Sequence, residues 1–147
     1  MAQKTALIVG STGIVGLNLS HHLINNGWKV FGLARTPSSE GGVTPVAANL
    51  LDEKGLQASL KDVSATHVFI TSWMRQESEA ENIKVNGAMV RNVLNAVALS
   101  RSVQHVALVT GLKHYLGPFE AYGKGQMPPT PFREDQARLN VPNFYYS

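Results

Sequence analysis

The chain has no cysteine among its 147 residues, which excludes disulfide bonds, thiolate metal sites and a cysteine nucleophile. The absence is compatible with a reducing compartment, and we expect a cytoplasmic protein that holds no metal. Charged residues make up only 16% of the sequence, and scattered basic residues give a net charge of +3, which favours a solvated surface over a nucleic-acid interface. No apolar run approaches the roughly 20 residues that cross a bilayer, so we expect no membrane partner.

Hydrophobic residues make up 44% of the sequence, enough for one domain with its own core. We expect strands at 5–9, 29–34, 43–48, 67–72 and 106–110, and helices at 14–25, 56–60 and 77–99. The alternation predicts an α/β fold, a Rossmann-type doubly wound parallel sheet in the order 3-2-1-4-5. The domain spans residues 1–147, with βα units over 1–111 and an irregular active-site segment over 112–147.

Three glycines follow the first apolar run at regular spacing, at Gly10, Gly13 and Gly16. The first suits a tight turn, the second leaves room for a pyrophosphate, and the third allows close packing of the helix on the sheet. The same spacing also fits a strand-to-helix turn that binds nothing, so both interpretations stay open. The candidate cofactor-binding residues of this turn are Gly10, Ser11, Thr12, Gly13, Ile14, Val15 and Gly16.

The end of the second predicted strand bears on the choice between NAD and NADP. An NAD site usually places a carboxylate there, but this chain has Arg35 and no carboxylate before Glu40. An arginine can pair with a 2′-phosphate, so we expect NADP(H), although Arg35 also fits an ordinary surface loop. The ends of the third and fourth strands add Asn49, Leu50, Ser72 and Trp73 as further candidates; Asn49 could equally cap a turn, and Trp73 could be packing.

Several motifs carry a family resemblance. The glycine turn, Val85-Asn86-Gly87 in the long helix and Thr110-Gly-Leu-Lys113 are similar to those of extended or atypical short-chain dehydrogenases/reductases. Within that group, the chain resembles the progesterone 5β-reductase/iridoid synthase-like subfamily. The narrower resemblance rests on the segments 110–124, 131–135, 138–139 and 143–146.

The resemblance implies NADPH-dependent reduction of the C=C bond of an enone or enal, a small-molecule substrate. In that family hydride goes to the β-carbon, and a tyrosine and a lysine stabilise the enolate oxygen. The lysine follows Thr-Gly-x, which matches Lys113, and the tyrosine is the first of the pair in Asn-Phe-Tyr-Tyr, which matches Tyr145. The usual Tyr-x-x-x-Lys pattern is absent, which agrees with this relocated pair.

Members of that subfamily continue well beyond the length of this sequence. We therefore expect an N-terminal portion that is truncated before most of the substrate pocket and inactive by itself. Two other interpretations stay open. One is a non-catalytic NADP-binding or sensor domain, as in NmrA-like relatives of the fold. The other is a truncated product with neither ligand nor activity, kept folded by self-association as a homo-oligomer.

Overall fold

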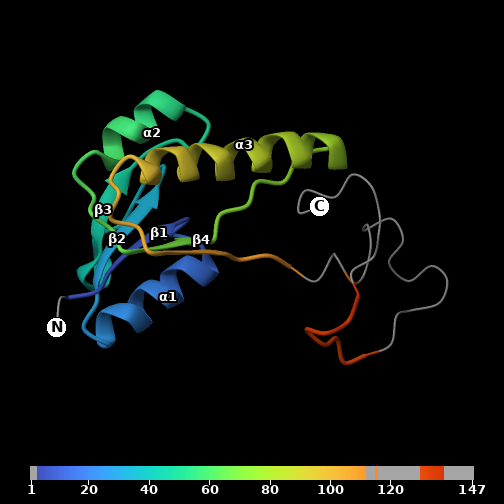
Figure 1. Ribbon diagram of the computed structural model, residues 1–147, viewed down its shortest axis with the longest axis horizontal. Coiled ribbons are helices and arrows are strands. Elements are labelled where there is room, and N and C mark those ends of the chain that lie inside the picture. Colours follow the sequence, from blue (N-terminus) through green and yellow to red (C-terminus); the bar gives the residue numbers. More distant parts are fainter. Residues whose placement is uncertain (1–2, 112–114, 116–129, 138–147) are drawn as a thin grey trace.

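The computed structural model describes residues 3–111, 115 and 130–137. Within this part, strands and helices alternate along the chain, as Figure 1 shows. The strands are β1 (Thr5–Val9), β2 (Lys29–Ala34), β3 (Thr44–Ala47), β4 (His67–Ile70) and β5 (His105–Leu108). The helices are α1 (Ile14–Asn25), the short 3₁₀ turn η1 (Glu40–Gly42), α2 (Glu53–Leu60) and α3 (Glu79–Ala98).

The five strands form one parallel sheet in the order β3-β2-β1-β4-β5, which confirms the predicted topology. β1 lies at the centre, where Leu7 is opposite Phe31 on β2 and Val68 on β4. Residues 6–9 of β1 are fully buried, because helices cover both faces of the sheet at this position.

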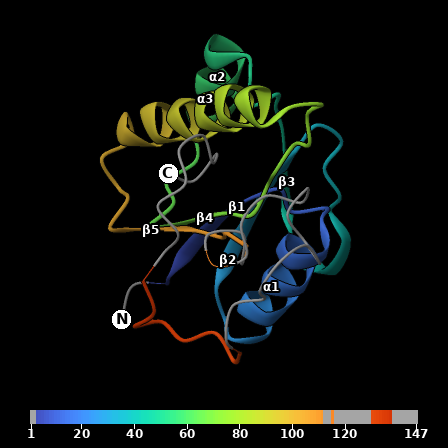
Figure 2. The same ribbon diagram turned by 90° about the vertical axis from the view of Figure 1, so that its right-hand side faces the viewer.

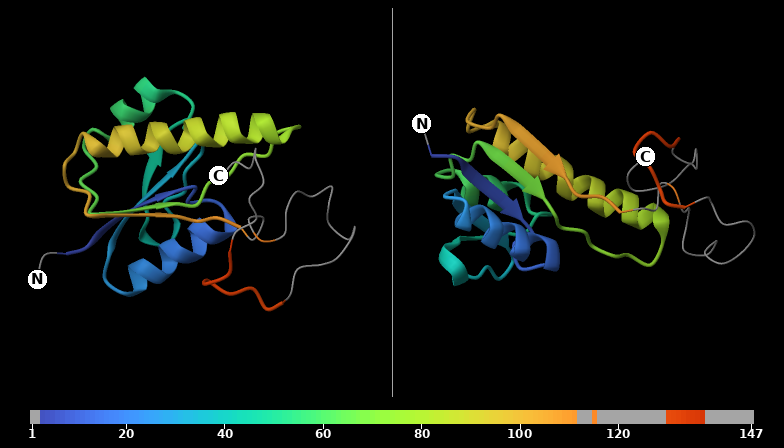
Figure 3. Two further views of the ribbon diagram at one scale, coloured as in Figure 1. Left: turned by 45° about the vertical axis from the view of Figure 1, so that its right-hand side comes forward. Right: turned by 90° about the horizontal axis from the view of Figure 1, so that it is seen from below.

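Helices lie on both faces of the sheet, with α1 on one face and α2 and α3 on the other (Figures 1 and 2). The two further views in Figure 3 show the same layers. The core therefore has two parts. Beneath α2 and α3 it contains Leu7, Val9, Leu33, Val46, Leu56, Leu60, Val68, Ile70, Val93 and Val97; beneath α1 it contains Ala6, Ile8, Leu23, Val30 and Val43.

Two helices begin where a side chain satisfies their first free N–H groups. Asp52 accepts a hydrogen bond from the Gly55 amide at 3.1 Å and starts α2. Ser78 accepts one from the Glu81 amide at 3.2 Å, and its hydroxyl donates to the Glu81 carboxylate at 3.1 Å. These caps explain why α2 begins before the predicted position and α3 begins slightly after it.

Candidate functional site

The glycine turn connects β1 to α1 and folds back against the end of β2. The amides of Gly10 and Ser11 both donate to the Leu33 carbonyl, at 2.8 and 3.2 Å. Gly10 has a φ of +89°, a conformation that side chains rarely adopt. A Cβ on Gly16 would collide with the carbonyl oxygen of Gly10, so the fold requires glycine at both positions.

Gly13 is different, because the fold does not require glycine there. Its φ is −79°, and an added Cβ would lie 3.4 Å from the nearest heavy atom, the Gly10 carbonyl oxygen. Gly13 is also the N-cap of α1, where no side chain caps the helix and the first turn has no acidic residue. The first N–H groups of α1 are therefore available to an anion, and the missing side chain leaves space for it.

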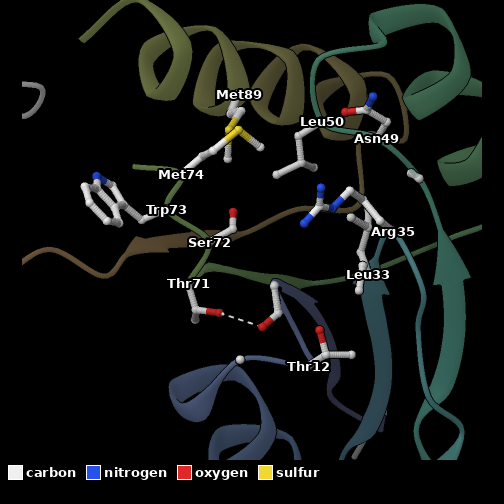
Figure 4. Close-up of a pocket in the computed structure, with 14 residues that line it drawn as sticks. Thr12, Leu33, Arg35, Asn49, Leu50, Thr71, Ser72, Trp73, Met74 and Met89 are labelled. Carbon is white, nitrogen blue, oxygen red and sulfur yellow. Dashed lines mark hydrogen bonds between the residues drawn. The ribbon is translucent and has the colours of Figure 1, made fainter. Parts of the chain in front are cut away.

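A cavity of about 360 Å³ opens beside this turn, at the carboxyl ends of the central strands (Figure 4). The fold thus brings together residues from four separate strand ends, as expected for a ligand site in a parallel α/β sheet. Eight of the candidate residues from the sequence line it: Gly10, Thr12, Gly13, Arg35, Asn49, Leu50, Ser72 and Trp73.

Two polar side chains of this cavity are suited to bind a ligand. Arg35 is exposed and extends its guanidinium toward the space between Leu50 and Ser72 (Figure 4). No carboxylate of the described residues forms an ion pair with it. The Ser72 hydroxyl oxygen is buried and has no hydrogen-bond partner among the residues that the structure describes. A buried hydroxyl usually has a partner, so a polar ligand would satisfy it.

Asn49 caps a turn, which was one of its two predicted roles. Its side-chain oxygen accepts a hydrogen bond from the Leu51 amide at 3.1 Å. Asn49 and Leu50 form one wall of the cavity, and residues 71–74 form the opposite wall. Thr71 fixes this second wall, because its hydroxyl donates to the Val9 carbonyl at 2.8 Å. Both walls are therefore fixed by hydrogen bonds within the protein, one local and one between neighbouring strands, before any ligand arrives.

Four of the cofactor-binding candidates lie outside the lining of this cavity. Ile14 and Val15 are exposed on the first turn of α1, and Gly16 is buried against the glycine turn. Ser11 is buried and lines a separate cavity of about 190 Å³ beside Val43. Lys113 and Tyr145 lie outside the described residues.

Sequence reasoning missed several residues of the cavity. Ala34, Ala48, Thr71 and Met74 directly adjoin candidates that it found, and Leu33 is two residues from Arg35, so extending each candidate segment by one or two residues would have included them. Met89 gave no comparable signal, since it lies in the middle of α3 and reaches the cavity only through the packing of that helix.

A second cavity, of about 610 Å³, adjoins the first between α3 and β5. It shares residues 71–73 with the first cavity, and its apolar lining includes Val90, Leu94 and Leu108. Leu94 and Leu108 are 41% and 50% exposed.

The described residues contain no group of three or more histidine, aspartate or glutamate side chains that could hold a metal ion. No helix in that same part combines the length and the apolar character needed to cross a membrane.

The sequence matches the model of the NAD dependent epimerase/dehydratase family over residues 6–147. An (S)-8-oxocitronellyl enol synthase of Camptotheca acuminata is 40% identical over 156 residues, and a 3-oxo-Delta(4,5)-steroid 5-beta-reductase of Arabidopsis thaliana is 39% identical. Each match covers 99% of this chain and 40% of the relative. The chain thus spans about 40% of the length of these relatives.

Solved structures show the same fold at low identity. The UDP-glucose 4-epimerase of Brucella ovis, in complex with NAD, has a TM-score of 0.73 at 17% identity, over 97% of this chain and 44% of that one. A short-chain dehydrogenase of Burkholderia cenocepacia, in complex with NADP, has a TM-score of 0.67 at 15% identity, over 79% of this chain and 57% of that one.

Proposed function

Because the chain belongs to the NAD dependent epimerase/dehydratase family, whose proteins bind NAD(P), we propose that its first cavity binds NADP(H). The observation that carries the proposal is the convergence of the glycine turn and Arg35 on one cavity. The start of α1 and the space at Gly13 suit a pyrophosphate, while Arg35 suits the phosphate that distinguishes NADP from NAD.

We further propose that the chain contributes the cofactor site of a reductase that acts on activated C=C bonds of enones or enals. Bound NADPH would supply the hydride. The curated relatives named as a steroid 5-beta-reductase and as enol synthases support this reaction class.

Lys113 and Tyr145 are the proposed catalytic residues. As the β-carbon is reduced, negative charge develops on the substrate oxygen, and a phenol O–H aimed at that oxygen stabilises the charge. A nearby ammonium favours anionic character on the phenol, so the lysine would assist the tyrosine.

Replacing Arg35 tests the choice of cofactor. We expect Arg35→Ala to weaken NADPH binding by about tenfold or more, because a charge-assisted pair with the 2′-phosphate is lost. NADH binding should change by less than about twofold, since NADH has no such phosphate. Titration of both cofactors by tryptophan fluorescence measures the two affinities. Lys61→Ala, which removes one positive charge at the far end of α2, is the matched control. Equal affinity of the parent chain for the two cofactors would contradict the proposed preference.

Turnover tests the reaction class separately from binding. In a form of the protein extended to the length of its relatives, we expect Tyr145→Phe to slow enone reduction on the order of a hundredfold. NADPH binding should stay unchanged, because the phenol acts on the substrate. NADPH oxidation with a panel of small enones measures the rate. Binding without turnover in the unsubstituted protein would favour a non-catalytic NADP-binding domain instead.

A further inference from the structure

Helix α3 carries asparagines whose side chains hold the loops around the first cavity. Asn82 and Asn86 are each only 5% exposed, although an amide side chain rarely lies so deep without a structural reason. Asn92 is half-buried on the same helix. Each of the three makes at least one hydrogen bond that leaves the helix, and these bonds reach backbone atoms of two different loops. Asn86 also donates to the Asn82 carbonyl within the helix, at 2.9 Å.

Asn86 binds both backbone polar groups of one residue in the loop between β4 and α3. Its side-chain oxygen accepts from the Met74 amide at 2.8 Å, and its side-chain nitrogen donates to the Met74 carbonyl at 2.8 Å. One turn earlier, Asn82 accepts from the Gln76 amide at 2.7 Å. The carboxamide offers a donor and an acceptor together, whereas an ionised aspartate offers only acceptors and leucine offers neither, so neither residue can replace Asn86 fully.

Asn92 makes the corresponding contact on the opposite wall. Its side-chain nitrogen donates to the Leu50 carbonyl at 2.9 Å, in the loop between β3 and α2. Leu50 and Met74 both line the first cavity, and Figure 4 shows their side chains close to Met89 of α3. One helix therefore sets the positions of two walls that are far apart in the sequence.

We propose that Asn86 and Asn92 are positioning residues for the cofactor, each for a different half. Asn92 fixes the Leu50 wall, next to Asn49 and Arg35, where the adenosine end would lie. Asn86 fixes the wall of Ser72 and Met74, where the nicotinamide end of the cofactor would lie. The inference rests on the proposed function for the identity of the ligand, while the anchoring of the loops does not depend on it.

The separate roles of Asn86 and Asn92 are tested by comparing the affinity of each variant for NADPH with its affinity for adenosine 2′,5′-bisphosphate, which is the adenosine part of the cofactor. We expect Asn86→Leu to weaken NADPH binding by about tenfold, because two buried hydrogen bonds that hold the wall are lost. Binding of adenosine 2′,5′-bisphosphate should change by less than about twofold. Asn92→Leu should weaken both ligands to a similar degree, since both use the Leu50 wall. Asn95→Leu, on the exposed side of α3, is the matched control and should change neither.

Amide hydrogen exchange of the ligand-free chain gives a second readout. In Asn86→Leu, the Met74 amide should exchange about tenfold faster or more, because it has lost its acceptor. It should be unaffected in Asn92→Leu. Asn86→Asp keeps the acceptor and loses the donor, so its NADPH affinity should lie between those of the parent and Asn86→Leu. Equal loss of both ligands in Asn86→Leu, or unchanged exchange at Met74, would overturn the inference. A parent chain that binds neither ligand would overturn the proposed function, and exchange would still decide the anchoring.

Discussion

At the scale of single residues, His67 lies in an aromatic and basic cluster at the end of the sheet opposite the cavity. Its ring meets Trp28 edge-on, with centroids 4.8 Å apart, and the ring of His105 lies 5.9 Å away. The Lys4 ammonium lies 5.1 Å from the centroid of the Trp28 ring. Burial, followed by the nearby charges of His105 and Lys4, lowers the pKa of His67 below its ordinary value of 6.5.

This cluster predicts a loss of stability in acid. Between the lowered pKa and 6.5 the unfolded chain binds more protons at His67 than the folded chain, so stability falls as the pH falls through that window. His67→Phe keeps a ring against Trp28 and removes the titration. We expect its urea midpoint to depend less on pH between about pH 7 and pH 5 than that of the parent. His22→Gln, at an exposed histidine of α1, is the control. Equal pH dependence in the parent and His67→Phe would contradict this account.

At the scale of elements, two glycines at the start of α1 have different roles, one in packing and one in ligand binding. A Cβ on Gly16 would collide with the Gly10 carbonyl, whereas a side chain on Gly13 meets no such obstacle and projects where a pyrophosphate would bind. The packing of α1 on the sheet therefore depends on Gly16, and ligand binding on Gly13.

This division predicts opposite behaviour of two variants. Gly16→Ala should lower the free energy of unfolding by about 1–3 kcal/mol, because the helix must move away from the turn. Gly13→Val should leave stability nearly unchanged and abolish NADPH binding. Thermal unfolding and a NADPH titration of each variant measure both quantities. Normal NADPH binding by a folded Gly13→Val variant would show that the turn does not hold the phosphates.

The same elements show how far sequence reasoning reached. The bounds of α1 and β2 agree with the prediction, because Gly27 marks the helix end and apolar residues mark the strand. The start of α2 was wrong by three residues, since Gly55 in its first turn resembles a helix breaker. The hydrogen bond from the Gly55 amide to the Asp52 side chain stabilises the start of α2 despite the low helix propensity of that glycine. Local capping geometry, which depends on backbone angles, was not visible in the residue pattern.

At the scale of the whole molecule, the strand order followed from general rules. A glycine turn after the first strand and right-handed crossovers leave few topologies, and the predicted order was confirmed. Candidate residues directly after strands were brought together, because parallel strands end at one edge of the sheet. Met89 and the hydrogen bonds from α3 depend on how a long helix packs across that edge, which local periodicity does not specify.

The central claim is that NADP(H) binds at this edge of the sheet, and chemical-shift mapping of the labelled chain tests it most directly. Adding NADPH should shift the amide signals of Gly13, Arg35, Leu50 and Ser72, which line the first cavity. The amide of His67, at the opposite end, should not move. Shifts confined to the second cavity, between α3 and β5, or no shifts at millimolar NADPH, would contradict the account.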